Sequence, residues 1–304
     1  MFYRQGLPYI FVFLWSSAFI TAKICVEYAT PFALLFTRFA LVAIIFGAMM
    51  AMGQQLRRSR AAAKNVSEIA TPDSWGVIGF TALVGLLLHG GYLGSVFLAL
   101  SLGLPAGMAA LIVSMQPLLS AFFAIFLFGE AMRRVQWAGI AIGFFGVCIV
   151  LVPTIGGVLP ASGVAVAFIG LLSITGGTLL QKKIGNTIGL LRGNFIQALA
   201  ASLLFAAVSP ILEDPHIEWT LPFILALSWQ ILAISIGAYM IFMVLIKRDS
   251  MAATSSLLFL VPPTTAILAA LWFSEPLTMI GLVGFALASC GVFLVTRYSS
   301  PATP

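Results

Sequence analysis

The feature that most constrains this chain is a succession of long, continuous apolar runs separated by short polar breaks. A helix needs about 20 apolar residues to cross the hydrocarbon core of a bilayer, and the runs are of that order. The strands of a membrane barrel would instead give short segments of alternating polarity. Only 8% of the residues are charged, against about 25% in a soluble domain, which leaves too few to cover a water-facing surface. We therefore expect an all-α integral membrane protein.

The polar breaks divide the chain into ten expected transmembrane helices. Their bounds, read from the apolar runs, are Leu7–Glu27, Pro31–Met52, Trp75–Leu102, Ala106–Phe128, Val135–Val152, Gly163–Gln181, Gly189–Ile211, Leu221–Ile246, Ala252–Phe273 and Leu277–Arg297. All of the 15 Lys and Arg residues except Lys23 and Arg38, which lie within spans, fall on the side of the N-terminus. Because Lys and Arg are retained in the cytoplasm during insertion, we expect both termini to be cytoplasmic, in a multi-pass protein of the inner membrane. The net charge of +6 then reflects orientation, and nucleic acid is not an expected partner.

The second part of the chain resembles the first. The stretch AFFAIFLFGE, followed by a Gly-rich run, matches AILAALWFSE, followed by another. The comparison superposes Pro117 on Pro262, Glu130 on Glu275, Gly139 on Gly284, Gly146 on Gly291 and Lys23 on Lys182. We therefore expect one five-helix repeat at residues 7–153, with a basic cytoplasmic loop at residues 53–74, and another at residues 163–297. An odd number of helices per copy makes the two copies inverted, which is typical of secondary transporters.

The two copies resemble the EamA family of the drug/metabolite transporter superfamily. The resemblance rests on PLLSAFFAIFLFGE with GIAIGFFGVCIVL, on PPTTAILAALWFSE with GLVGFALASCGVFLV, and on LWSSAFITAK with PFALLFTRFALVA. It implies ten helices, cytoplasmic termini, and a central cavity lined mainly by the first, third, fourth, sixth, eighth and ninth helices. It also implies export of amino acids or related metabolites without ATP, and the chain has no GxxxxGK[ST] phosphate loop. No cofactor is expected. The chain departs from a symmetric pattern at Arg38, whose counterpart in the second copy is Gln197.

Polar side chains within a membrane are costly, so each is a candidate site. His89 falls near the middle of the third span, where an imidazole could couple protons or could simply bond to a neighbouring helix. Arg38 could bind a substrate carboxylate, or could form a structural ion pair with Glu27, which follows Lys23 by one helical turn. Aromatic rings can line a cavity, and small hydroxyls can bind a ligand or pack helices. The candidate substrate-binding residues are Trp15, Ser16, Arg38, His89, Tyr92, Gln116, Thr175, Trp229, Tyr239 and Phe242.

Prolines within the fourth and ninth spans free backbone carbonyls and kink helices, so we expect hinges there. Glu130 and Glu275 end matching helices at opposite faces of the membrane, as caps or gate contacts. The candidate hinge and gate residues are Pro117, Pro262, Pro263, Glu130 and Glu275. The cysteines Cys25, Cys148 and Cys290 lie in apolar runs without metal-ligand spacing, and we expect no metal site.

These patterns favour a secondary transporter that exports amino acids or related small metabolites by alternating access. An efflux transporter for drugs or hydrophobic cations is the alternative within transport, although no Asp or Glu falls at mid-bilayer to balance a cation. A non-transporting scaffold or receptor, or an intramembrane enzyme, are the alternatives of another class. The chain lacks HExxH, GxSxG and an intramembrane carboxylate cluster, so we expect no enzyme. Expected partners are a small-molecule substrate, membrane lipid and, as a candidate coupling ion, protons. A monomer and a homodimer both stay open.

Overall fold

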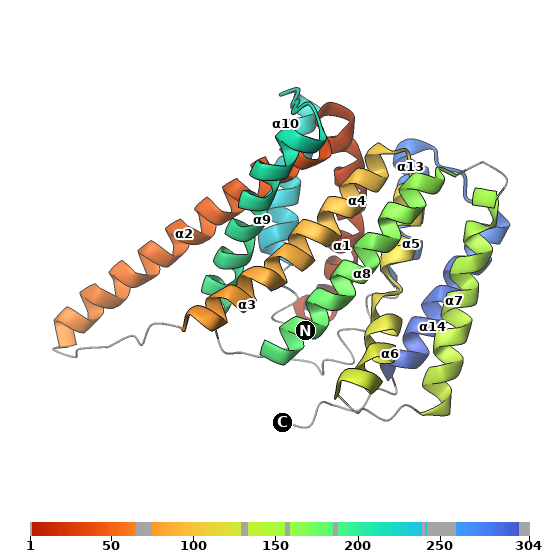
Figure 1. Ribbon diagram of the computed structural model, residues 1–304, viewed down its shortest axis with the longest axis horizontal. Helices are drawn as coiled ribbons and strands as arrows, with labels where there is room; N and C mark the ends of the chain where they lie inside the picture. The colour runs from red at the N-terminus through yellow and green to blue at the C-terminus, as the bar shows by residue number, and fades with distance from the viewer. Residues whose placement is uncertain are drawn as a thin grey trace.

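The computed structural model describes residues 2–64, 74–128, 133–155, 159–184, 188–238, 241 and 260–297. These residues form a bundle of helices, and the part of the chain that is described contains no strand beyond one isolated bridge between Ala29 and Ile217. Figure 1 shows the helices packed side by side, with most of them running between two common ends of the bundle. The all-helical membrane fold expected from the apolar runs is thereby confirmed.

The first part of the chain contributes eight helical segments, two of which continue earlier ones without a break. They are α1 (Phe2–Tyr28), α2 (Pro31–Lys64), α3 (Trp75–Gly85), the π-helical turn η1 (Leu86–Gly91), α4 (Tyr92–Ser101), α5 (Ala106–Val113), α6 (Gln116–Phe128) and α7 (Arg134–Ile155). The second part contributes α8 (Ala161–Ile184), α9 (Leu190–Leu212), α10 (Leu221–Ser228), the π-helical turn η2 (Trp229–Ala238), α13 (Val261–Phe273) and α14 (Met279–Arg297).

Seven of the described helices are long and apolar enough to cross a membrane. They coincide with the expected first four spans and with the sixth, seventh and eighth. Three shorter apolar helices, at Arg134–Val150, Val261–Phe273 and Met279–Val295, fall where the fifth, ninth and tenth spans are expected. The structure therefore supports a multi-pass membrane protein, and the count of ten spans stays a prediction.

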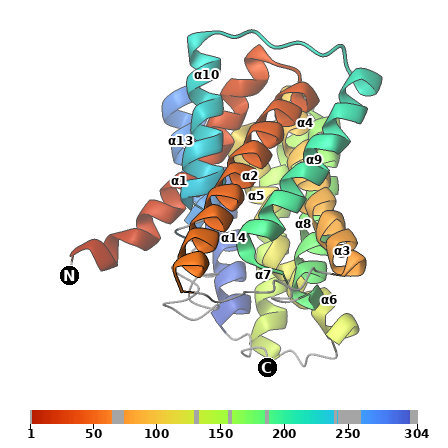
Figure 2. The ribbon, with the colours of Figure 1, turned by 90° about the vertical axis from the view of Figure 1, so that its left-hand side faces the viewer.

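The connections gather at two ends of the bundle (Figures 1 and 2). One end holds the turn between α1 and α2 and the segment between α9 and α10, which carry the carboxylates Glu27, Glu213 and Glu218. We call this the acidic end. Here the α9–α10 segment lies over the α1–α2 turn, because Thr30 N donates to the His216 carbonyl at 3.0 Å and Glu218 N donates to the Tyr28 carbonyl at 2.8 Å. The two parts of the chain are thus joined by backbone hydrogen bonds.

Glycines let α7 and α14 approach each other unusually closely, and the two helices run side by side in Figure 1. A Cβ atom at Gly146 would lie 2.8 Å from the carbonyl oxygen of Gly284. At the other end of the same contact, a Cβ atom at Gly139 would lie 2.9 Å from the carbonyl oxygen of Gly291. No side chain fits in either place, so backbone packs on backbone as in other membrane helix pairs.

Candidate functional site

The most unusual buried group of the molecule is the guanidinium of Arg38, in α2. The residue is 4% exposed. Its Nη2 donates to the Ser235 hydroxyl of η2 at 3.2 Å, while its buried Nε has no hydrogen-bond partner in the part of the chain that the structure describes. The rings of Phe39 and Phe97 lie 5.5 and 6.0 Å from the guanidinium carbon, within range of cation–π attraction. Among the described residues, the partners of this permanent charge are thus one neutral hydroxyl and two aromatic rings.

His89 also lies beside Phe39. The two rings are 4.9 Å apart between centroids, with 37° between their planes. The Gln197 side chain of α9 lies near the imidazole, and its amide donates to Gln181 Oε1 of α8 at 3.0 Å. The adjacent residues Arg38 and Phe39 thus contact η2 and η1 respectively. We call Arg38, Phe39, His89, Gln197 and Ser235 the Arg38 cluster.

Both π-helical turns of the described chain lie against this cluster. A π turn widens the helix and leaves its carbonyls less regularly paired, which is why such turns are frequent at functional sites. In η1 the Leu87 carbonyl accepts a hydrogen bond from Ser173 Oγ of α8 at 3.1 Å. In η2 the Gln230 carbonyl accepts one from Ser235 Oγ at 3.0 Å. In each π turn, a backbone carbonyl thus accepts a hydrogen bond from a serine hydroxyl, which can change its hydrogen-bond partner at little energetic cost.

The Gln230 side chain fixes η2 to α1. Its amide donates to the Ala18 carbonyl at 2.7 Å and to Thr21 Oγ1 at 2.8 Å, whereas its own buried Oε1 has no partner among the residues described. The neighbouring Trp229 donates from its indole nitrogen to Ser17 Oγ at 2.9 Å. Two adjacent residues of the second part of the chain therefore hold the first helix beside the Arg38 cluster.

An ion pair connects separate helices near the acidic end of the bundle. Lys23 Nζ of α1 lies 2.6 Å from Glu275 Oε1, in the segment that follows α13. The same carboxylate oxygen accepts from Ala106 N, the first residue of α5, at 3.1 Å, and Lys23 Nζ lies 4.4 Å from the centre of the Phe273 ring. The side chains of Lys23 and Glu275 are only 23% and 15% exposed. One contact thus joins α1, α5 and the end of α13.

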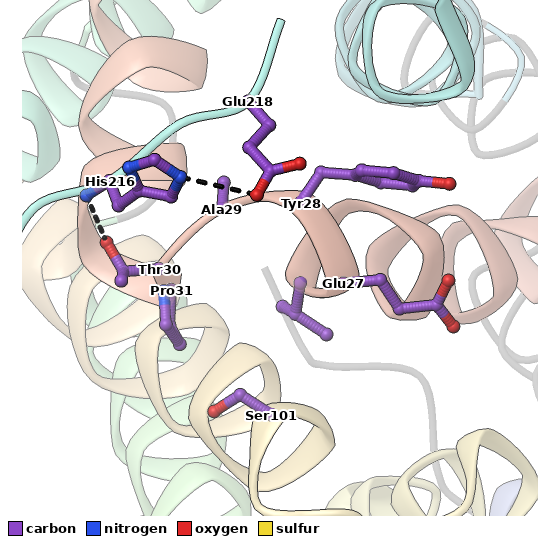
Figure 3. Close-up of a pocket in the computed structure, with 9 residues that line it drawn as sticks. Glu27, Tyr28, Ala29, Thr30, Pro31, Ser101, His216 and Glu218 are labelled. Atoms are coloured by element: carbon purple, nitrogen blue, oxygen red, sulfur yellow. Dashed lines mark hydrogen bonds and ion pairs between the residues drawn. The ribbon is translucent and has the colours of Figure 1, made fainter. Parts of the chain in front are cut away.

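The expected alternative for Arg38, a structural ion pair with Glu27, is wrong. Both residues are described and they form no ion pair, because Arg38 faces Ser235 and Lys23 faces Glu275. Glu27 instead lines a cavity of about 280 Å³ at the acidic end, together with Thr30, Ser101 and Glu218. Figure 3 shows this cavity, with the Glu27 side chain directed away from the His216–Glu218 pair.

Other candidate residues lie in helix contacts. The Trp15 ring packs on Phe11 at 5.4 Å between centroids, and Ser16 Oγ, fully buried, donates to the Val261 carbonyl at 3.4 Å. Thr175 Oγ1 donates to the Leu171 carbonyl of its own helix at 2.7 Å. Gln116 donates to Ser120 Oγ at 2.9 Å.

Tyr92 is buried and close enough to Arg38 for an electrostatic interaction. Of the candidates, Arg38, His89 and Tyr92 come together.

The prolines mark helix ends. Residues Ser114 and Met115 separate α5 from α6, and Pro117 is the second residue of α6. Pro262 and Pro263 lie in the first turn of α13. The N–H groups of a first turn have no carbonyl partner within the helix, so proline costs no helical hydrogen bond there. The candidates Tyr239, Phe242 and Glu130 lie outside the described residues. Cys25 is buried whereas Cys148 and Cys290 are exposed, and all three are free thiols.

Several residues of the site are not among the candidates from the sequence, namely Phe39, Gln197 and Ser235 of the Arg38 cluster and the neighbouring Gln230. Ser235 and Gln230 are polar residues within an apolar span, which is a usable signal, but a serine in a helix commonly bonds to its own backbone. Gln197 was noted only as the counterpart of Arg38. The described residues contain no group of three His, Cys, Asp or Glu side chains that could hold a metal ion.

Comparison with known proteins agrees with this architecture. The model of the EamA-like transporter family matches residues 7–152 and again residues 161–297, which together are nearly the whole chain. The chain belongs to the EamA-like transporter family. It is a membrane transporter by that membership, and the expectation from its repeated motifs is confirmed.

Several relatives have names that describe transport. The chain is 28% identical to the "Uncharacterized inner membrane transporter YedA" of Escherichia coli strain K12, over 100% of this chain and 96% of that one. It is 26% identical to a "Probable amino-acid metabolite efflux pump" of Salmonella typhimurium, over 95% and 93% of the two chains. A solved crystal structure aligns with a TM-score of 0.64 at 20% identity, over 96% of each chain, which supports the fold. A location in the inner membrane follows from these relatives and from the apolar helices.

Proposed function

We propose that this chain is a secondary transporter that exports amino acids or related small metabolites by alternating access. The observation that carries the proposal is the Arg38 cluster, because both parts of the chain contribute to it. Residues 38, 39 and 89 come from the first match to the family, and residues 197 and 235 come from the second. A polar centre between two related halves is where secondary transporters bind their substrate. The efflux-pump name of the Salmonella relative supports the amino-acid class.

The crossing of α7 and α14 supports two inverted five-helix repeats. The internal repeat superposes Gly139 on Gly284 and Gly146 on Gly291. In space, Gly139 meets Gly291 and Gly146 meets Gly284. In a contact between two copies related by a two-fold axis, if residue i of the first copy meets the equivalent of residue j in the second copy, then residue j meets the equivalent of residue i. The contact has this form, and an axis in the membrane plane would relate two copies inserted in opposite directions.

The ion pair between Lys23 and Glu275 is then the outer gate of the transporter. The acidic end is the outside in this proposal, because its connections carry carboxylates and no Lys or Arg. The gate joins α1 to the segment after α13, which belong to different halves, so their separation would open the Arg38 cluster to the outside. The interruption between α5 and α6, next to Pro117, supplies a hinge beside it.

The proposal is tested by metabolite release from loaded cells. Cells that express the chain, or an empty vector, are fed dipeptides so that free amino acids accumulate, and the medium is profiled by mass spectrometry. We expect faster release of one amino-acid class, and a loss of that release in a His89→Ala/Tyr92→Ala double variant. Glu218→Gln, a change to an exposed carboxylate at the acidic end, is the matched control. Equal release from vector and wild-type cells for every amino acid would refute amino-acid export.

A multidrug transporter for hydrophobic cations is the less favoured candidate. Within the described residues the Arg38 cluster contains no carboxylate, and its one permanent charge is positive. A cation placed there would meet repulsion in a medium of low dielectric constant. Release of amino acids together with unchanged growth in the presence of cationic dyes would support the preferred function.

A further inference from the structure

We infer that the Nε–Nη2 edge of Arg38 is the subsite for the carboxylate of the transported molecule, and that the Ser235 hydroxyl occupies this subsite in the closed conformation. The inference rests on the proposed function and deepens it, because it restricts the substrates to molecules that carry a carboxylate.

The charge balance around Arg38 requires an anion. Arg38 is 4% exposed, and within the described chain its guanidinium forms no ion pair with a carboxylate, since Lys23 faces Glu275 and His216 faces Glu218. A buried charge is normally paired, because removal of an ion from water is costly. A structural arginine in a membrane protein would therefore be expected to face a carboxylate or several backbone carbonyls. Among the described residues Arg38 has one serine hydroxyl as its hydrogen-bond acceptor, so its charge is left without an anion.

The free positions on the guanidinium match a carboxylate. The Nε and Nη2 hydrogens point in parallel from one edge of the planar group, and a carboxylate accepts both in a two-point contact. Nη2 has the Ser235 hydroxyl as its acceptor, whereas Nε has none. A hydroxyl oxygen is a single acceptor and engages half of this edge. A carboxylate in the same place would satisfy both atoms and would neutralise the charge.

Ser235 can be displaced without loss of its other hydrogen bond. Its hydroxyl donates to the Gln230 carbonyl at 3.0 Å while it accepts from Arg38. Once Arg38 turns to a carboxylate, that donation within η2 persists. The Phe39 and Phe97 rings lie near the guanidinium and Arg38 is buried, so that the contact forms in a medium where it is strong.

The internal repeat indicates that there is one such subsite in the chain. The counterpart of Arg38 is Gln197, which lies against Gly85 at the start of the other π turn and near His89. An amide carries no charge and offers no guanidinium edge. The substrate is therefore expected to bind in one orientation, with one carboxylate directed to α2 and the remainder of the molecule towards the His89 side.

The first experiment uses the wild-type protein and matched pairs of probes. The purified full chain in lipid nanodiscs is heated with L-leucine or L-leucinamide, with L-phenylalanine or its amide, and with L-threonine or its amide, at equal concentrations and constant ionic strength. We expect at least one acid to raise the melting temperature while its amide does not. An equal shift from acid and amide, an equal shift from sodium chloride, or no shift from any acid would overturn the inference.

The second experiment replaces Arg38 and Ser235 and measures the same shift in melting temperature. Loss of a two-point, charge-assisted contact lowers affinity by about 10- to 100-fold, so Arg38→Gln is expected to abolish the shift at the same probe concentration. Arg38→Lys retains the charge as a single point and is expected to give an intermediate affinity. Ser235→Ala removes the competing hydroxyl and is expected to retain the shift or enlarge it. Arg297→Gln, an exposed arginine at the end of α14, is the matched control and retains the shift.

Transport measurements separate this inference from the proposed function. Stabilisation by acids without any flux in reconstituted vesicles would leave the carboxylate subsite standing and would refute transport of those acids. Flux of amides at the rate of the acids would leave transport standing and would refute the subsite. If Arg38→Gln fails to fold, the acid–amide comparison in the wild type and the Arg38→Lys variant still test whether Arg38 binds the carboxylate.

Discussion

The Lys23–Glu275 ion pair offers the sharpest test of alternating access, because a native cysteine reports on it. Replacement of Glu275 by Gln removes the charge but retains an oxygen that can still accept from Ala106 N. The side chains are mostly buried, at 23% and 15% exposed, so the loss is that of a hydrogen bond between charged groups, about 1.5–3 kcal/mol. If the pair forms in the closed state alone, the ratio of open to closed molecules rises by about 10- to 150-fold.

Cys25 is the reporter for that change. It is fully buried, lies two residues after Lys23, and is an electrostatic neighbour of Arg38. Cys148 and Cys290 are exposed and are first replaced by Ser, so that one thiol stays in the chain. The rate at which a membrane-impermeant maleimide labels Cys25 from the outside then measures the open population. We expect Glu275→Gln to raise this rate by the same factor.

Two further variants make the gate prediction refutable. Glu218→Gln changes a carboxylate that is 56% exposed at the same end of the bundle, and it should leave the labelling rate of Cys25 unchanged. The exchange Lys23→Glu with Glu275→Lys restores an ion pair and should return the rate towards that of the wild type. An unchanged rate in Glu275→Gln, or an equal increase in Glu218→Gln, would show that the Lys23–Glu275 contact does not hold the outer gate.

Three other predictions follow from single contacts. The Glu213 carboxylate accepts hydrogen bonds from two N–H groups at the start of α2, at 3.1 and 2.7 Å. Glu213→Gln should therefore lower the free energy of unfolding by about 1–2 kcal/mol, measured by thermal unfolding. Asp214→Asn, at the exposed neighbouring residue, should leave the stability unchanged. Gly146→Val should abolish folded protein on gel filtration, because its Cβ would meet Ala288 N at 2.6 Å, whereas Gly176→Ala, with open space around it, should fold. If His89 couples protons, His89→Gln flattens the pH dependence of transport in vesicles; an unchanged profile assigns the imidazole to helix packing.

The fold could be predicted further from sequence than the site could. Length and apolarity of the runs predict membrane helices, since the bilayer sets both quantities independently of what the helices contact. The expected bounds of the second helix begin at Pro31, as α2 does. The π turns η1 and η2 were not foreseen, because a π turn leaves no clear mark in hydrophobic periodicity and depends on contacts with neighbouring helices.

The ion pairs show why side-chain partners were harder to predict. Lys23 and Glu27 are one turn apart on α1, a spacing that favours a local pair. Glu27 instead faces the cavity at the acidic end, and Lys23 binds Glu275 from the far end of the chain. A partly buried contact with a distant carboxylate is stronger than an exposed one within a helix, so tertiary structure decides between them. The internal repeat points to Glu275 as a cap or gate contact, but it does not indicate Lys23 as the partner of that carboxylate.

The internal repeat expected from the sequence connects the Arg38 cluster to the proposed alternating access. Arg38 and Gln197 occupy matching positions in the two copies, and each reaches a π turn of the other half: Arg38 bonds to Ser235 in η2, and Gln197 approaches His89 in η1. Gly85, next to η1, permits this approach, since a Cβ there would lie 2.5 Å from the Gln197 Cα. A two-fold related pair of contacts would let either half rock about the same centre. The exchange of Arg for Gln makes one of these contacts charged, so a carboxylate that binds Arg38 would release η2 and leave η1 in place.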